Sequence, residues 1–177
     1  MGDPEKLPAY DIRDVKILIV DGNKHMRHLL KQILHVFAVR NLREADDALT
    51  GFKEFKEFKP DIVLTEWELT PMDGADFVRM IRRAEDSPNP MASIIMITAY
   101  TEATVVATAR DCGINEFLAK PISPNRLYRR IAALIDRPRP FIRSKTYVGP
   151  CRHRRKIDDY DGPRRRESDA DDIFVID

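Results

Sequence analysis

The sequence has little cysteine and no long apolar run, and these two absences limit the kinds of protein that it can be. Cys112 and Cys151 are the two cysteines, and their separation matches no metal-binding or redox spacing, which argues against a disulfide scaffold or a zinc site. No apolar run reaches the roughly 18 residues that a membrane-spanning helix needs. The first residues, "MGDPEKLPAYDIRD", are acidic and lack the apolar core of a secretory signal. We therefore expect a cytoplasmic protein with free thiols.

Net charge is also small, at +1, but its distribution along the chain is uneven. Residues 14–136 hold 17 Lys and Arg against 18 Asp and Glu, whereas residues 137–156 hold eight basic residues and no acid. This change of charge, together with several prolines, predicts a boundary near Asp136. The expected organisation is an extension over 1–13, one domain over 14–136, and an arginine-rich tail over 137–177.

Five short apolar segments alternate with five amphipathic patterns between residues 14 and 136. The alternation predicts an α/β domain, in which a parallel sheet is covered by helices on both faces. The last helix has Ser123 as a capping residue and Pro124 at its first position. The expected strands are 15–20, 39–43, 61–65, 93–98 and 115–120.

Polar side chains follow several of these strands. The carboxyl ends of parallel strands form the usual ligand-binding edge of such a sheet, so these residues are expected to converge there. Acids, a hydroxyl and an ammonium are suited to bind a phosphoryl group and Mg²⁺, or to accept the phosphoryl group. The residues at the strand ends are Asp21, Gly22, Glu66, Glu68, Thr98 and Lys120.

The segments "ILIVDGN…MR", "PDIVLTEWELTPMDG", "MITAY" and "FLAKP" resemble the motifs of CheY-like receiver domains of response regulators. The resemblance covers about residues 14–136 and implies a flavodoxin-like (βα)5 fold with strand order 2-1-3-4-5. It implies Glu66 at the phosphoacceptor position, Asp21 in the acidic pocket, and Lys120 as the phosphate-binding lysine. It also implies Thr98 and Phe117 as the switch pair.

The same resemblance implies that the protein is not an enzyme and acts through a protein partner. The expected partner surface combines the fourth helix, the fifth strand and the fifth helix. A histidine kinase and a flagellar motor component are candidate partners.

Two departures from the family pattern affect the phosphorylation site. The family has Asp where this chain has Glu66, and a second acid where this chain has Gly22. Mg²⁺ requires close to ideal octahedral geometry, so the predicted metal site is degraded. Glu66 is instead expected to pair with Lys120 and to accept a hydrogen bond from Thr98, as a partial mimic of the phosphorylated state. A retired switch and a site that still accepts a phosphoryl group remain alternatives.

The tail contains a near-repeat with a period of 13 residues, of the form Tyr-x-Gly-Pro-x-Arg. Its arginine forks suit phosphate and guanine, and the tail resembles that of CheY-like effectors of cyclic di-GMP, the Cle proteins. A docking segment for a protein partner is an open alternative, and a nucleic-acid-binding tail is disfavoured by the nearby acids. For the apolar end "DIFVID", sheet-edge addition, docking in a groove and a frayed terminus all remain open. The predicted nucleotide-binding residues are Tyr147, Arg152, Arg154, Arg155, Tyr160, Arg164, Arg165 and Arg166.

Overall fold

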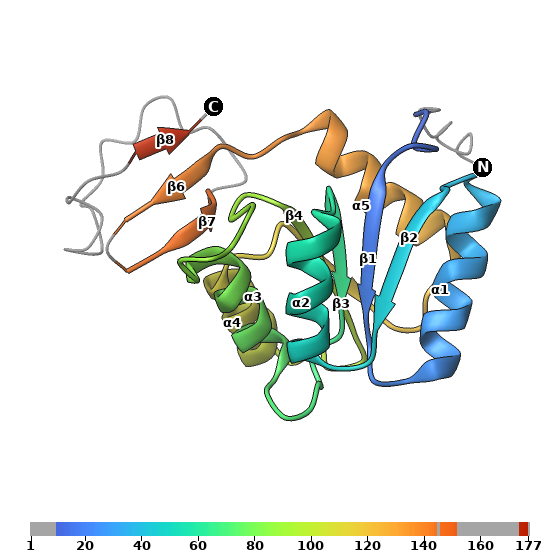
Figure 1. Cartoon of the computed structure of the whole chain (residues 1–177), viewed down its shortest axis with the longest axis horizontal. Helices are drawn as coiled ribbons and strands as arrows, with labels where there is room; N and C mark the ends of the chain where they lie inside the picture. Colours follow the sequence, from blue (N-terminus) through green and yellow to red (C-terminus); the bar gives the residue numbers. More distant parts are fainter. Residues whose placement is uncertain (1–9, 145, 152–173, 177) are drawn as a thin grey trace.

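The computed structural model describes residues 10–144, 146–151 and 174–176, and its centre is a five-stranded parallel sheet of order β2-β1-β3-β4-β5 (Figure 1). This α/β architecture and strand order confirm the fold expected from the sequence. The strands are β1 Lys16–Val20, β2 Asn41–Ala45, β3 Ile62–Thr65, β4 Ser93–Thr98 and β5 Glu116–Ala119. The helices are α1 Lys24–Val36, α2 Ala48–Phe58, α3 Gly74–Arg83, α4 Ala103–Cys112 and α5 Pro124–Asp136.

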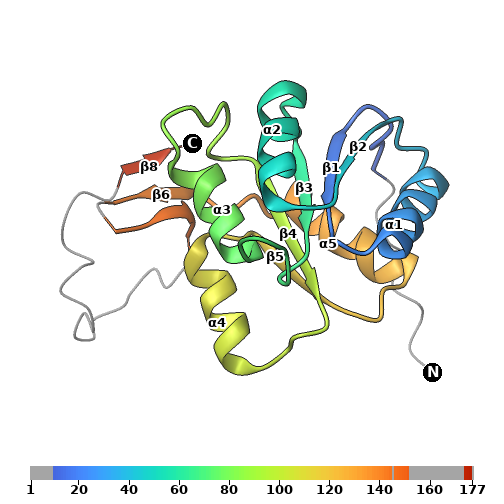
Figure 2. The same cartoon turned by 60° about the horizontal axis from the view of Figure 1, so that its bottom comes forward.

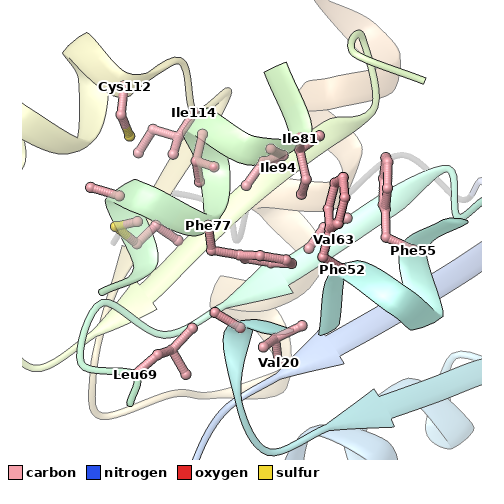
Figure 3. Packing of buried hydrophobic residues seen from close by; sticks show 14 of the residues in the cluster. Val20, Phe52, Phe55, Val63, Leu69, Phe77, Ile81, Ile94, Cys112 and Ile114 are labelled. Carbon is pink, nitrogen blue, oxygen red and sulfur yellow. The ribbon is translucent and has the colours of Figure 1, made fainter. Parts of the chain in front are cut away.

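Helices cover both faces of this sheet, and each face has its own hydrophobic core. On one face α1 and α5 pack against β-strand side chains such as Ile19 and Leu64. On the other face α2, α3 and α4 surround Phe55 and Phe77, which are fully buried (Figure 3). The alternating apolar residues of the strands thus supply two cores, which accounts for their continuous burial.

Capping residues that can be recognised in the sequence mark the starts of two helices. Asn23 caps α1 by accepting from the amides of His25 and Met26, at 2.9 and 3.2 Å. Ser123 caps α5 with Pro124 at its start, as predicted. None of the helices in the described part of the chain is long and apolar enough to cross a lipid bilayer.

A second, antiparallel sheet follows α5, within the arginine-rich tail, for which a disordered or partly ordered state is the expectation from the sequence. It consists of β6 Phe141–Arg143, β7 Val148–Pro150 and β8 Phe174–Ile176, in the order β7-β6-β8. Of the alternatives for the apolar end, the structure supports sheet-edge addition within the chain, because β8 pairs with β6. Both views place this sheet beside α3 (Figures 1 and 2).

A buried arginine on α3 lies between the second sheet and the segments that precede β4 and β5. Arg82 is 2% exposed, and its guanidinium donates to the carbonyls of Pro90, Ala92 and Gly113 at 2.6–3.0 Å. It also donates to the Asn115 side chain at 3.1 Å, and burial lowers the pKa of Arg82 to about 10. It therefore stays charged at neutral pH.

The antiparallel sheet packs directly over this arginine. The ring of Phe141 in β6 lies 5.0 Å from the Arg82 guanidinium carbon. Gly149 in β7 approaches the backbone of Gly113 so closely that a Cβ at position 149 would lie 2.9 Å from the Gly113 Cα. Only glycine avoids this contact at the Gly149 φ of +159°.

Candidate functional site

The carboxyl ends of the parallel strands bring together the predicted pocket residues. Asp21 follows β1, Glu66 follows β3 and Lys120 follows β5, so the three side chains share one edge of the sheet. Backbone hydrogen bonds extend the sheet to these positions. The Glu66 amide donates to the Val20 carbonyl at 2.9 Å and the Lys120 amide donates to the Thr98 carbonyl at 2.8 Å. Rigid strands thus set the position of each charge.

Lys120 bridges the two buried carboxylates. Its Nζ donates to Asp21 Oδ2 at 3.1 Å and also to Glu66 Oε2, and the two acids are 4% and 8% exposed. Burial by itself lowers the pKa of Lys120. The hydrogen bond and charge of Glu66, helped by Asp21, outweigh burial, so the pKa of Lys120 is raised above its ordinary value. The site is therefore a compact group of two negative charges and one positive charge.

The remaining carboxylate oxygens are occupied by backbone donors. Asp21 Oδ1 accepts from the Asn23 amide at 2.7 Å, and Glu66 Oε1 accepts from the Trp67 amide at 2.6 Å. Every carboxylate oxygen of the pair thus has a protein donor, with the ammonium of Lys120 between them.

The resemblance to receiver domains implies a Mg²⁺ site at this edge, and Asp21 and Glu66 are the two carboxylates that could hold the ion. Within the part of the chain that the structure describes, no group of three or more His, Cys, Asp or Glu side chains converges for a metal. Gly22 contributes no side-chain ligand, and oxygens of Asp21 and Glu66 face Lys120. A Mg²⁺ ion bound through these two carboxylates would compete with Lys120 for the same oxygens and would keep several waters.

The predicted switch residues lie nearby but are not joined to Glu66. Thr98 is fully buried, and its hydroxyl oxygen accepts from the Tyr100 amide at 3.2 Å. Among the described residues no hydrogen bond connects it to Glu66, so that expected contact is absent from this structure. Phe117 is half-buried and packs against the core formed with α3 and α4.

One contact across the site was not predicted. The Tyr100 hydroxyl, in the loop after β4, donates to Glu68 Oε2 in the loop after β3 at 2.8 Å. This hydrogen bond raises the pKa of Tyr100 above its ordinary value. Glu68 stood out in the sequence as an acid at a strand end, and Tyr100 holds the equivalent place after the next strand. Each lies two residues beyond a predicted site residue, Glu66 or Thr98, and this equivalent spacing could have predicted the contact.

The loop that carries Glu66 is closed by a glycine. The Gly74 amide donates to the Trp67 carbonyl at 2.7 Å, and a Cβ on Gly74 would lie 2.1 Å from the Glu66 carbonyl oxygen. The "PMDG" end of the loop therefore has a steric reason for its glycine. Close approach of the two backbones fixes the direction in which Glu66 leaves β3.

The structure describes only one of the residues predicted to bind a nucleotide in the tail. Tyr147 is 8% exposed, and its hydroxyl donates to the Pro150 carbonyl at 2.7 Å, so it stabilises the turn between β6 and β7. The other predicted residues lie outside the described part of the chain. They are Arg152, Arg154, Arg155, Tyr160, Arg164, Arg165 and Arg166.

Sequence comparisons agree with this geometry. Residues 17–132 match the response regulator receiver domain. Chemotaxis protein CheY-3 of Vibrio cholerae is 31% identical over 125 residues, which cover 71% of this chain and 95% of that protein. Chemotaxis protein CheY of Pseudomonas aeruginosa is 29% identical over 123 residues, which cover 70% of this chain and 98% of that protein.

Solved structures show the same fold. The receiver domain of the putative response regulator NarL from Mycobacterium tuberculosis superposes with a TM-score of 0.63 at 22% identity, covering 71% of this chain and 98% of that one. CheY4 of Vibrio cholerae gives a TM-score of 0.61 at 20% identity, covering 67% and 96%. The match to the family ends at residue 132, so the antiparallel sheet lies beyond it.

Proposed function

Because the chain belongs to the receiver domain family of response regulators, we propose that it is a CheY-like signalling protein whose receiver pocket is held by a fixed charge. In this proposal the protein resides in the cytoplasm and acts by binding other proteins rather than by catalysis. The face formed by α4, β5 and α5 is the proposed partner surface. A histidine kinase and a flagellar motor component are the candidate partners.

The observation that carries the proposal is the Lys120 bridge between Asp21 and Glu66. In phosphoryl-transfer sites a lysine holds the oxygens of the phosphoryl group, and here a carboxylate oxygen of Glu66 takes that place. Glu66 supplies negative charge to Lys120 without a covalent modification. A receiver pocket that no longer switches would have the same contacts. It would differ from the proposed state because no partner protein would respond to them.

Incubation with acetyl phosphate and Mg²⁺, followed by intact-protein mass spectrometry, tests this state of the pocket. We expect no mass increase for the wild type or for Glu66→Asp, because Gly22 still lacks a carboxylate. The double variant Glu66→Asp/Gly22→Asp is the positive arm. A Cβ at position 22 would meet only the Asp46 carbonyl oxygen, at 3.6 Å, which is an ordinary van der Waals contact.

Phosphorylation through Glu66 is the competing function, favoured by the burial of its carboxylate at the end of β3 beside Lys120. A stable acyl phosphate on the wild type would establish that function and refute the fixed-charge proposal. Phosphorylation of the double variant alone would support it. A Lys120→Met version of the double variant is the control, because it removes the group that positions the phosphoryl oxygens.

We further propose that the arginine-rich tail binds cyclic di-GMP. Support comes from the sequence: each Gly-Pro pair is followed by arginines, whose guanidinium forks suit phosphates and guanine edges. Titration calorimetry compares the wild type with Arg152→Ala/Arg165→Ala, and we expect the double substitution to abolish the binding heat. No heat with the wild type would refute nucleotide binding.

Titrations with cyclic di-GMP and with RNA, each at several salt concentrations, separate the alternative functions of the tail. A nucleic-acid-binding tail would give RNA affinity that falls steeply with salt, because bound counterions are released. A protein-docking tail would leave both nucleotide and RNA titrations flat. Binding of cyclic di-GMP with weak salt dependence is the outcome that supports the proposal.

A further inference from the structure

A pocket of about 330 Å³ lies where α4 faces β5, on the side of the domain that carries the antiparallel sheet. Its volume is at the lower end of the roughly 300–1,000 Å³ range typical of small-molecule sites, which suits a single ring system. It is separate from the group of charges around Lys120. The pocket is lined by Val106, Arg110, Ile114, Asn115, Glu116, Phe117 and Arg139.

The lining combines apolar, aromatic and cationic groups. Val106, Ile114 and Phe117 provide apolar surface, and Phe117 adds an aromatic ring. Arg110 is exposed on α4, where its Nε donates to Asp111 Oδ1 at 3.1 Å. The one acid in the lining, Glu116, is paired with Arg130 of α5 at 3.0 Å, which offsets its charge. Such a lining suits a flat ring attached to an anionic group, since aromatic rings stack on base planes and guanidinium groups bind phosphate.

The pocket also borders the start of the arginine-rich tail, because Arg139 is one of its lining residues. Arg139 Nη1 donates to the Asn115 carbonyl at 3.1 Å, at the start of β5, while Nη2 donates to the Cys151 carbonyl at the end of β7. The Cys151 amide donates to the Pro140 carbonyl at 2.7 Å. The end of β7 is thus held at the pocket wall.

We propose that this pocket receives a guanine base of a guanine nucleotide, stacked against Phe117, with Arg110 directed to its phosphate. The assignment rests on the proposed binding of cyclic di-GMP and names where one of its bases sits. Phe117 lies on β5, and Lys120 follows directly after the end of this strand, so an occupied pocket contacts the strand that leads to the charged group of the receiver.

The test measures binding of cyclic di-GMP by calorimetry to the wild type and to variants of the pocket. Val106→Trp fills the pocket from an exposed position on α4, and Thr104→Trp adds the same bulk on the same helix outside the lining. Arg110→Ala removes the rim cation, with Arg129→Ala on exposed α5 as its charge-matched control. These four sites are exposed, so the variants are expected to fold.

We expect Val106→Trp and Arg110→Ala each to weaken binding at least about tenfold, since base stacking and phosphate contacts have this order of effect. The two controls should bind within about twofold of the wild type. NMR titration should shift the amides of Ile114 and Phe117. Cyclic di-AMP and GMP are comparison ligands: cyclic di-AMP should bind more weakly, and GMP should shift the same amides at higher concentration.

The pocket and the tail can fail separately. If the wild type binds cyclic di-GMP while Val106→Trp binds equally well and the Ile114 and Phe117 amides do not move, the pocket assignment is wrong and the tail proposal stands. If the wild type gives no binding heat and no shifts, both are refuted. Loss of binding in Thr104→Trp as well as Val106→Trp would also count against a base in the pocket.

Discussion

Replacing Arg82 with alanine should destabilise the protein far more than an arginine change elsewhere on α3. The side chain donates to three backbone carbonyls and one amide oxygen, and all these acceptors lie in the segments just before β4 and β5. Alanine removes every donor at once and opens space beneath Phe141. The buried carbonyls then have no partner within the protein.

The magnitude follows from these contacts. A buried acceptor left without a donor costs about 1–3 kcal/mol, and water will reach some of these carbonyls once the side chain is gone. If two of the four acceptors stay without a partner, the expected loss is about 2–6 kcal/mol. Typical domains have only about 5–15 kcal/mol of unfolding free energy, so a large part of the total is at stake.

Urea unfolding followed by the fluorescence of Trp67, the single tryptophan, measures this loss. Arg79→Ala is the matched control, because Arg79 is an exposed arginine on the same helix whose ion pair with Asp76 contributes about 0–0.5 kcal/mol. Hydrogen exchange of the Cys151 amide, which bonds to the Pro140 carbonyl, reports on the antiparallel sheet itself. Exchange there should accelerate in Arg82→Ala and stay unchanged in Arg79→Ala.

Arg82→Met separates the loss of hydrogen bonds from the loss of charge. Replacing a buried ion pair with apolar residues is often neutral, but the partners of Arg82 are uncharged backbone groups that methionine leaves unpaired. We therefore expect Arg82→Met to remain destabilised by about 2 kcal/mol or more. Losses for Arg82→Ala within about 0.5 kcal/mol of those for Arg79→Ala would refute the reasoning.

Three further predictions concern the pocket loop, a helix cap and the charged group. Gly74→Ala should lower stability and shift the Glu66 amide in NMR spectra, because its Cβ would lie 2.1 Å from the Glu66 carbonyl oxygen; an unchanged spectrum would contradict the close approach. Asp47→Ala removes the cap that accepts from the Thr50 amide and should cost about 1 kcal/mol in chemical denaturation at neutral pH. The pKa of Asp47 is lowered by those Thr50 hydrogen bonds, so its contribution is present above the ordinary pKa of 3.8 and disappears as pH falls through the lower folded value, where wild type and variant should converge. Lys120→Met leaves the buried carboxylates without their positive partner and should lower the free energy of unfolding by about 3 kcal/mol. Because the pKa of Lys120 is raised, the stability difference between wild type and variant is fully present below the ordinary pKa of 10.5 and declines only as pH rises through the folded pKa. Equal stabilities at pH 7 would contradict this prediction.

The sequence was sufficient for the parallel sheet because its signals are local. Apolar runs such as residues 93–98 match β4, and Ser123 and Pro124 mark the start of α5. The weakest strand, expected at 39–43, is β2 at Asn41–Ala45, and its mixed exposure explains the displaced boundary. The positions of Asp21, Glu66 and Lys120 followed from the rule that parallel strands end at one edge.

The antiparallel sheet was beyond this reasoning because nothing local specifies it. Its strands have three residues each, and β8 pairs with β6 from the far end of the tail. Its anchor, Arg82, looks in the sequence like one more basic residue of an amphipathic helix. Only the folded structure shows that its partners are carbonyls rather than an acid or water. The Tyr147 repeat was noticed, yet its first tyrosine proved to stabilise a turn.

β6 pairs with both β7 and β8, so strands that lie far apart in the sequence are held to one central strand. Pairing of such distant strands meets the entropy of loop closure, a term that grows only with the logarithm of the number of residues between them. A substitution that disrupts β6 would therefore release both of its neighbours.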